Sequence, residues 1–206
     1  MSDYLKIHPI NPQPRLISQV GKVLKNGGVI AWPTDTTYAL GCHLGDKIAV
    51  DRIRGLRRLP DHHHMTLVCP DLKMIASYAR ISNETYRILK SLTPGAYTFL
   101  LIATKEVPRR LQHPRKKTVG LRVPKSPLTQ AILSELGEPL LTTTLIPPDD
   151  EYPMTDPNEI EERFGHALDL VVDGGEGGMG STTVVDLTGP IPQLVRAGLG
   201  PLDGLV

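Results

Sequence analysis

The chain has 206 residues, of which 40% are hydrophobic and 22% are charged, with a formal net charge of +1. This length suits one substantial domain, and the composition is that of an ordinary soluble globular protein. No apolar run approaches the roughly 20 residues that a transmembrane helix needs, and the N-terminal stretch lacks the apolar core of a signal peptide. Cys42 and Cys69 are too few for a disulfide framework or a cysteine zinc site, so we expect a cytoplasmic protein without membrane contact.

The small net charge conceals two segments of opposite sign. Residues 105–122 carry seven Lys or Arg against one acid, Glu106, and residues 149–169 carry eight acids against Arg163. This segregation of charge predicts an asymmetric electrostatic field, in which one side of the protein suits an anionic partner. The alternative is that both segments are solvated surface loops.

Helical patterns and short apolar runs alternate along the chain. N-cap residues mark helix starts at Asp46, Ser82, Ser126 and Asp156, and Gly137 marks one helix end. The expected helices cover residues 14–26, 46–59, 82–92, 126–136 and 156–164. The expected strands cover residues 29–32, 65–69, 96–103, 118–123 and 139–144, with three more runs between residues 168 and 198.

The closing strands are joined by glycine-rich turns that are too short for parallel crossovers. We therefore predict a single α/β (α+β) domain over residues 1–206. Its core is a twisted mixed β-sheet of about seven strands flanked by helices, with an open cleft at the strand ends.

Polar side chains recur where the expected strands end. Ligands of open α/β sheets bind where loops from several strand ends converge. Hydroxyl donors and arginines without a clear nucleophile–base pair fit a phosphate or carboxylate ligand. Turn and cap chemistry is the alternative for each residue taken singly. The candidates are Thr34, Thr36, Tyr38, Thr98, Arg122, Thr142, Thr143, Thr144, Ser181, Thr182, Thr183 and Arg196.

Several familiar sites are excluded by sequence. There is no G-x-x-x-x-G-K-[ST] and no G-x-G-x-x-G that opens a helix. The glycine-rich stretch 173–183 joins two strands, and it is interpreted as a lid, a backbone-amide anion site or a mobile loop. His62, His63 and His64 are consecutive and do not easily converge on one ion, so we expect no metal there. A polar loop with one histidine near the substrate is the favoured interpretation.

Five motifs occur in a fixed order. They are WPTDTTYALGC at residues 32–42, TPGAYTFLL at 93–101, GLRVP at 120–124, GSTTVVDL at 180–187 and VRAG at 195–198. Together they resemble the P-T-[DE]-T-x-Y-G-L, P-G-x-x-T, G-x-R-x-P, P-S-T-V-V-D and R-x-G segments of the threonylcarbamoyl-AMP synthase family, the YrdC-like proteins.

The resemblance implies a YrdC-like fold and a reaction of threonine, bicarbonate and ATP, with magnesium. N-carboxythreonine attacks the α-phosphorus of ATP and expels pyrophosphate, and the product feeds modification of an adenosine beside the tRNA anticodon. Such chemistry needs positioning and cationic charge more than proton shuttling. By resemblance, Thr34, Thr36, Tyr38 and Arg122 bind threonine, Thr144, Ser181, Thr182 and Arg196 bind the nucleotide, and Arg57 and Arg58 are catalytic.

Two positions depart from the synthase pattern. The synthases carry K-x-R after the second helix, where this chain has Arg57 and then Leu59, so Arg58 substitutes only if the loop shifts by one residue. They carry S-x-N after the TTT strand, where this chain has Thr144 and Ile146. Losing one cation and one donor could remove several kcal/mol of transition-state stabilisation, on the order of the effects of single-donor deletions in enzymes. This pattern is similar to the YciO branch of the family.

Three functions remain open. The first is synthase-type nucleotidyl transfer. The second is binding of double-stranded RNA or tRNA through the basic stretch 105–122 together with Arg52, Arg54, Arg57 and Arg58. The third is formation of another acyl- or carbamoyl-adenylate from a different amino acid. The oligomeric state, monomer or homodimer, is also open.

Overall fold

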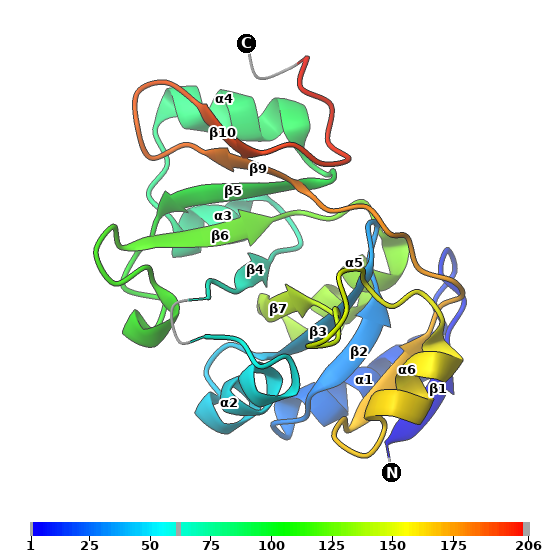
Figure 1. The fold of residues 1–206 in the computed structure, drawn as a ribbon. Helices are drawn as coiled ribbons and strands as arrows, with labels where there is room; N and C mark the ends of the chain where they lie inside the picture. The colour runs from blue at the N-terminus through cyan, green and yellow to red at the C-terminus, as the bar shows by residue number, and fades with distance from the viewer. Residues whose placement is uncertain (1, 61–62, 204–206) are drawn as a thin grey trace.

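The computed structural model describes residues 2–60 and 63–203, and its described strands form one ten-stranded mixed sheet (Figure 1). The order across the sheet is β1-β8-β2-β3-β7-β4-β6-β5-β9-β10. The strands are β1 (Asp3–Lys6), β2 (Ile30–Pro33), β3 (Tyr38–His43), β4 (Thr66–Val68), β5 (Tyr97–Ile102), β6 (Thr118–Arg122), β7 (Leu140–Thr144), β8 (Leu170–Asp173), β9 (Thr183–Asp186) and β10 (Gln193–Arg196).

The helices begin close to where the sequence places them. Asp46, Ser82, Ser126 and Asp156 are confirmed as N-caps whose side chains accept backbone N–H groups. Gly137 is confirmed as a left-handed C-cap. The helices are α1 (Pro14–Lys25), α2 (Lys47–Leu56), α3 (Leu72–Tyr78), α4 (Asn83–Leu92), α5 (Pro127–Leu136) and α6 (Pro157–Phe164), with a 3₁₀ turn, η1 (Arg109–Leu111).

The mixed α/β sheet is confirmed, but the predicted count of about seven strands is wrong. Strand β1 was missed because it is a short edge strand, DYLK, with little apolar patterning. Strand β3 was missed because it follows β2 after a tight turn, so residues 32–42 form a hairpin. Helix α3 was also missed, and α2 ends at Leu56, short of the expected residue 59.

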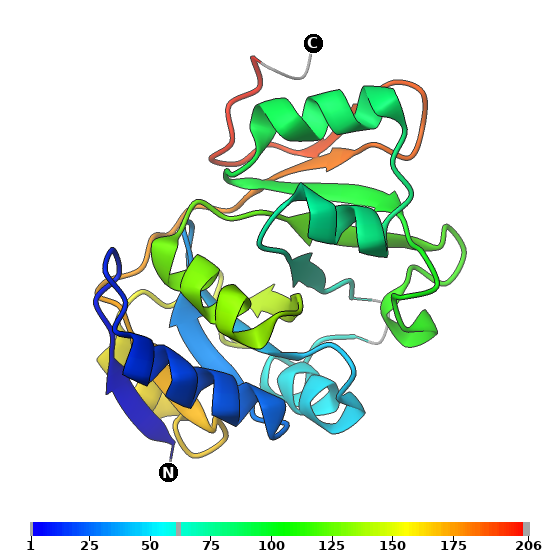
Figure 2. The same ribbon diagram turned by 180° about the vertical axis from the view of Figure 1, so that it is seen from behind.

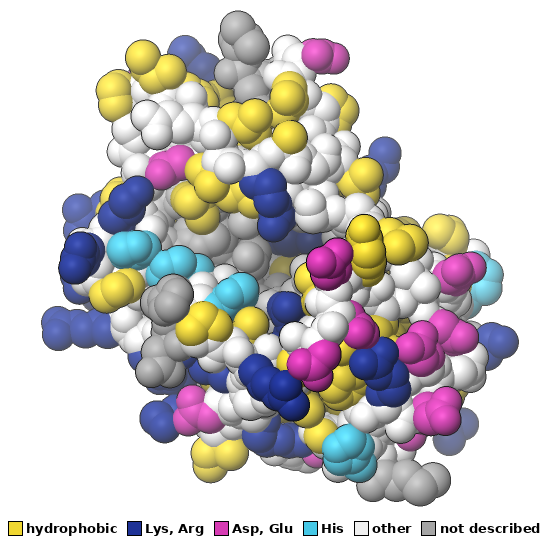
Figure 3. Space-filling model, in the orientation of Figure 1, with side chains coloured by type: hydrophobic (Ala, Val, Ile, Leu, Met, Phe, Trp, Pro, Cys, Tyr) yellow, Lys and Arg dark blue, Asp and Glu magenta, His cyan; other side chains and the backbone are white. Residues whose placement is uncertain are grey.

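The helices leave half of one sheet face open. Side chains in register on neighbouring strands share a face. One register row contains Ile30, Gly41, Thr142, Thr66 and Gly120 on five adjacent strands. Helices α1 and α5 cover this face at the Ile30 end (Figure 2). At the Thr66 and Gly120 end the twisted sheet turns the same face toward the viewer of Figure 1, and the surface there is hollowed (Figure 3).

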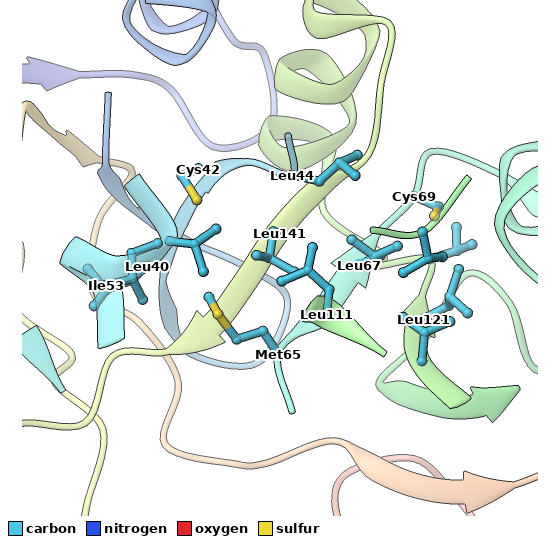
Figure 4. Packing of buried hydrophobic residues seen from close by; sticks show 14 of the residues in the cluster. Leu40, Cys42, Leu44, Ile53, Met65, Leu67, Cys69, Leu111, Leu121 and Leu141 are labelled. Atoms are coloured by element: carbon cyan, nitrogen blue, oxygen red, sulfur yellow. The ribbon is translucent and has the colours of Figure 1, made fainter. Parts of the chain in front are cut away.

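The opposite face is apolar across the central strands. Cys42, Leu141, Leu67 and Leu121 lie in register across β3, β7, β4 and β6 (Figure 4). They belong to one core that also contains buried side chains of α2, α3, α4 and α6. Because that core holds the central strands from behind, their other face is available for a ligand.

Candidate functional site

A cavity of about 290 Å³ occupies the open half of the sheet face. It begins at strand ends, as predicted, but it also extends over the face of the central strands, which was not predicted. Its lining combines arginines, apolar side chains and many hydroxyls. The hydroxyl-bearing lining residues are Thr34, Thr36, Thr37, Thr66, Thr98, Thr142, Thr143, Thr144, Ser181 and Thr182.

Strand alternation explains why these hydroxyls are in the cavity. On β4, Thr66 lines the cavity while its neighbour Leu67 is in the core. On β5, Thr98 lines the cavity while Phe99 is in the core. Thr66 and Gly120 were missed as site residues because each lies inside an apolar run. The signal that could have found them is this alternation of polar and apolar positions with period two.

The hairpin turn between β2 and β3 presents Thr36 to the cavity. The hydroxyl of Thr34 accepts the backbone N–H of Thr36 and of Thr37, at 3.2 and 3.3 Å, and donates to the Thr37 carbonyl at 2.8 Å. Thr34 therefore stabilises the turn, as Ser and Thr do in such turns. The Thr36 hydroxyl lies 3.1 Å from that of Thr34 and accepts a long hydrogen bond of 3.4 Å from Arg122.

Arg122 is a buried cation at the bottom of the site. Its Nη2 pairs with the carboxylate of Asp35, whose other oxygen accepts the backbone N–H of Lys125 at 2.8 Å. Burial lowers the pKa of Arg122, and the Asp35 carboxylate opposes this shift. Its buried Nε has no hydrogen-bond partner among residues 2–60 and 63–203. A buried donor without a partner destabilises the protein by about 1–3 kcal/mol. A ligand whose acceptor atom forms a hydrogen bond with this Nε would therefore be favoured.

A second polar group lies on the β5, β9 and β10 side of the cavity. The hydroxyls of Thr98 and Thr182 are 2.9 Å apart. Arg196 donates from Nη2 to the Thr182 carbonyl at 3.0 Å, which holds the guanidinium at the cavity wall. Ser181 precedes this pair and is exposed. The structure thus brings Ser181, Thr182 and Arg196 together, as the sequence predicts.

Arg57 enters the cavity, whereas Arg58 does not. Arg57 donates to the Ile146 carbonyl at 2.8 Å and to the Thr143 hydroxyl at 3.0 Å, and burial lowers the pKa of its guanidinium. Arg58 has a left-handed backbone, with φ of 46°, which ends α2. Its side chain is exposed and pairs with Asp149 at 3.2 Å. The loop shift that would make Arg58 a cation of the site is therefore not present.

The structure places Tyr38 outside the cavity lining. Its ring is fully buried, its hydroxyl donates to the Gly175 carbonyl at 2.8 Å, and burial raises the pKa of the phenol. The glycine-rich stretch packs on the same hairpin, because a Cβ on Gly178 would lie 2.2 Å from the Thr36 carbonyl oxygen. Tyr38 thus holds this stretch against the turn that carries Thr36.

The other residues that the sequence singled out also have defined positions. Thr144 and Ile146 both line the cavity, so the change from a polar residue to isoleucine faces the ligand space. His63 and His64 line it as well, and His62 lies outside the described residues. The described lining contains no Asp or Glu, and no group of three or more His, Cys, Asp or Glu in the described ranges is able to hold a metal. None of the helices in residues 2–60 and 63–203 is long and apolar enough to cross a membrane.

Comparison with known proteins identifies the family. The Sua5/YciO/YrdC family model, described as telomere recombination, matches residues 22–198. The chain therefore belongs to the Sua5/YciO/YrdC family. It is 51% identical over 201 residues to an uncharacterized protein of Haemophilus influenzae, covering 97% of each chain. It is 49% identical over 200 residues to the uncharacterized protein YciO of Escherichia coli, again covering 97% of each.

Solved structures support the same fold. The crystal structure of Escherichia coli YciO covers 100% of both chains with a TM-score of 0.95 and 48% identity. Sua5 of P. abyssi, complexed with L-threonine, matches 96% of this chain and 58% of its own with a TM-score of 0.87. At 24% identity the Sua5 match shows the fold alone. A threonylcarbamoyl-AMP synthase of Halorhodospira halophila is 28% identical over 178 residues, covering 86% of this chain and 92% of that protein.

Proposed function

We propose that the protein binds ATP and an amino acid in this cavity and acts as an L-threonylcarbamoyladenylate synthase-type nucleotidyltransferase, linked to tRNA threonylcarbamoyladenosine modification. The observation that carries the proposal is the buried guanidinium of Arg122, whose Nη1 donates to the Thr36 hydroxyl and whose Nε lacks a hydrogen-bond partner among the described residues. A guanidinium and a hydroxyl suit the carboxylate of a small amino acid. The relationship to a protein named threonylcarbamoyl-AMP synthase supports the choice of threonine.

The reaction balances without a protein nucleophile. The threonine amino nitrogen adds to bicarbonate with loss of water, which gives N-carboxythreonine. A carbamate oxygen then attacks the α-phosphorus of ATP, the bond from that phosphorus to the bridging oxygen breaks, and pyrophosphate leaves with the electron pair. Arg122 and Thr36 would orient threonine, while Thr144, Ser181, Thr182 and Arg196 would lie along the nucleotide. Their task is positioning and charge stabilisation.

Magnesium belongs to the substrate in this proposal. The described lining offers hydroxyls but no carboxylate, so it does not fit a resident Mg²⁺ site. We therefore assign the ion to MgATP, held by the phosphate oxygens. Arg57 would supply cationic charge, although two of its nitrogens already donate hydrogen bonds to the Ile146 carbonyl and the Thr143 hydroxyl.

The test is pyrophosphate release from ATP in the presence of threonine and bicarbonate. Release should require both co-substrates and should fall about tenfold or more in Thr36→Val, which removes one hydroxyl at nearly constant volume. Thr118→Val is the matched control, because Thr118 is buried in β6 and does not line the cavity. No release by the wild-type protein, beside an active synthase control, would refute the proposal.

The second candidate is binding of double-stranded RNA or tRNA. The observation that favours it is the exposed basic surface of the β5–β6 loop. Backbone-dominated RNA binding should weaken steeply as salt rises, so a flat salt response would exclude it. The exposed basic residues of the loop are Lys105, Arg109, Arg110, Arg115, Lys116 and Lys117.

A thermal-shift screen of amino acids and nucleotides tests a third outcome, in which an amino acid other than threonine stabilises the protein with ATP.

A further inference from the structure

A second depression lies directly beside the cavity. It has a volume of about 330 Å³ and shares His63, His64 and Met65 with the cavity lining, so only this short segment separates the two spaces. Its other lining includes Arg54, Arg109 and Arg110, and we call it the basic annex. Figure 3 shows histidine side chains between the central hollow and a group of Lys and Arg side chains at its margin.

Among the described residues, the carboxylate and guanidinium groups that line the basic annex are all guanidinium groups. Three arginines line it, and its described lining contains no Asp or Glu. Arg109 and Arg110 are exposed at the surface of η1, where their guanidinium groups can reach a ligand. A concave surface on which arginines are the charged side chains of the described lining concentrates anions. Guanidinium groups are particularly suited to phosphate oxygens because they donate in a planar fork.

The basic annex is held in shape by the loop that carries it. Val107 and Leu111 anchor the loop in the core, and the side chain of Gln112 donates to the Val107 carbonyl at 2.8 Å. Arg110 uses its Nη2 to donate to the Gly45 carbonyl at 3.0 Å. The same Nη2 also donates to the Leu44 carbonyl at 3.3 Å, so these two contacts position the guanidinium through one nitrogen while the residue stays exposed.

The opposite wall is held by an aromatic contact. The rings of His64 and His113 stack with centroids 4.8 Å apart. Nδ1 of His113 accepts the backbone N–H of Arg115 and of Lys116, at 3.1 and 3.0 Å. These contacts join the segment shared with the cavity to the basic loop, so the two spaces are placed relative to each other.

The cavity by itself is poorly equipped for a polyphosphate. Arg57, which the resemblance assigns to catalysis, already donates to a carbonyl and a hydroxyl. Ile146 presents an alkyl group where a hydrogen-bond donor would be useful. The cavity volume of about 290 Å³ is just below the range of about 300–1,000 Å³ that is typical of small-molecule sites. An amino acid and a complete nucleoside triphosphate together need more room.

From these observations we infer that the basic annex binds the pyrophosphoryl end of MgATP, and the pyrophosphate that leaves, through Arg109 and Arg110. The nucleoside and the α-phosphate stay in the cavity, and the chain of phosphates passes over the His63–Met65 segment. This inference rests on the proposed function, because it assigns a part of the same substrate. It adds a specificity element, since the annex favours nucleoside triphosphates over monophosphates.

The inference is tested by calorimetric titration of the full chain with four ligands, namely inorganic pyrophosphate, ATP, AMP and L-threonine. Arg109→Gln and Arg110→Gln should each weaken pyrophosphate and ATP about tenfold, the loss expected for one charge-assisted contact, and leave AMP and threonine unchanged. Arg115→Gln is the matched control, because it removes the same charge from the same loop at an exposed residue that does not line the annex.

The outcomes separate this inference from the proposed function. If wild-type protein binds threonine and AMP but pyrophosphate binding is absent or unaffected by both variants, the annex assignment is refuted and the proposed function stands. If threonine and ATP do not bind at all, the proposed function fails and the inference fails with it. An equal loss in Arg115→Gln would also refute the annex, because it would show a general charge effect. Arg109→Lys, which keeps the charge but not the planar fork, should recover part of the affinity.

Discussion

The buried ion pair between Arg122 and Asp35 gives a quantitative prediction for Asp35→Asn. Each side chain exposes 9% of its surface, so the substitution would leave the Arg122 charge uncompensated inside the protein. Removing one partner of a buried pair typically destabilises by about 3–5 kcal/mol. For a chain of this length, that corresponds to a decrease in melting temperature of roughly 6–20 °C.

The assay is thermal and urea unfolding beside a control with the same chemistry at the surface. Asp149→Asn removes a carboxylate from the Arg58 pair, whose side chains are 72% and 80% exposed. Exposed pairs contribute about 0–1 kcal/mol, so this variant should unfold almost like the wild type. If Asp35→Asn and Asp149→Asn have the same midpoint, Asp35 does not balance the charge of Arg122 and the reasoning is wrong.

Three further substitutions test the assigned geometry. Arg58→Gly should raise the free energy of unfolding by about 0.5–1 kcal/mol, because glycine adopts the left-handed backbone without strain. It should leave pyrophosphate release unchanged, and a large loss of release would show that Arg58 acts at the site. Ile146→Asn should raise kcat/KM for ATP about tenfold by adding an amide donor to the cavity wall, and no gain in the release assay would contradict the role given to this position. Burial raises the pKa of Tyr38, so above pH 10 the unfolded chain loses this proton first and stability falls by up to about 1.4 kcal/mol per pH unit from this residue. Tyr38→Phe should flatten that alkaline decline in unfolding experiments, and an unchanged slope would contradict the burial of the phenol.

The candidate site was predictable where polar residues end a strand or form a motif. Thr36, Arg122, Thr182 and Arg196 were all expected at a ligand site, and all line the cavity. The exclusion of Arg58 could not be predicted, because it depends on one backbone angle at the end of α2. Successive side chains of an α-helix point about 100° apart around its axis, so a helix that ends one residue earlier or later directs the next side chain elsewhere.

Tyr38 illustrates the same limit in a strand. Neighbouring residues on β3 point to opposite faces, so Ala39 lines the cavity while Tyr38 packs in the core. The motif that contains both residues does not say which face is open. That is decided by the helices, since α1 and α5 cover only one end of the face that carries Ala39.

The helix caps and the alternation of polar and apolar residues on the central strands are local properties, and the sequence by itself determines them through hydrogen bonding and the two-residue period of a strand. The open cavity face of β4, β5 and β6, which no helix of the described residues covers, is different. It follows from the order of ten strands and the twist of the sheet. So does the contact of the β5–β6 loop with the His63–Met65 segment that makes the basic annex a neighbour of the cavity. Tertiary structure decided these features because each depends on surfaces from distant parts of the chain meeting in space.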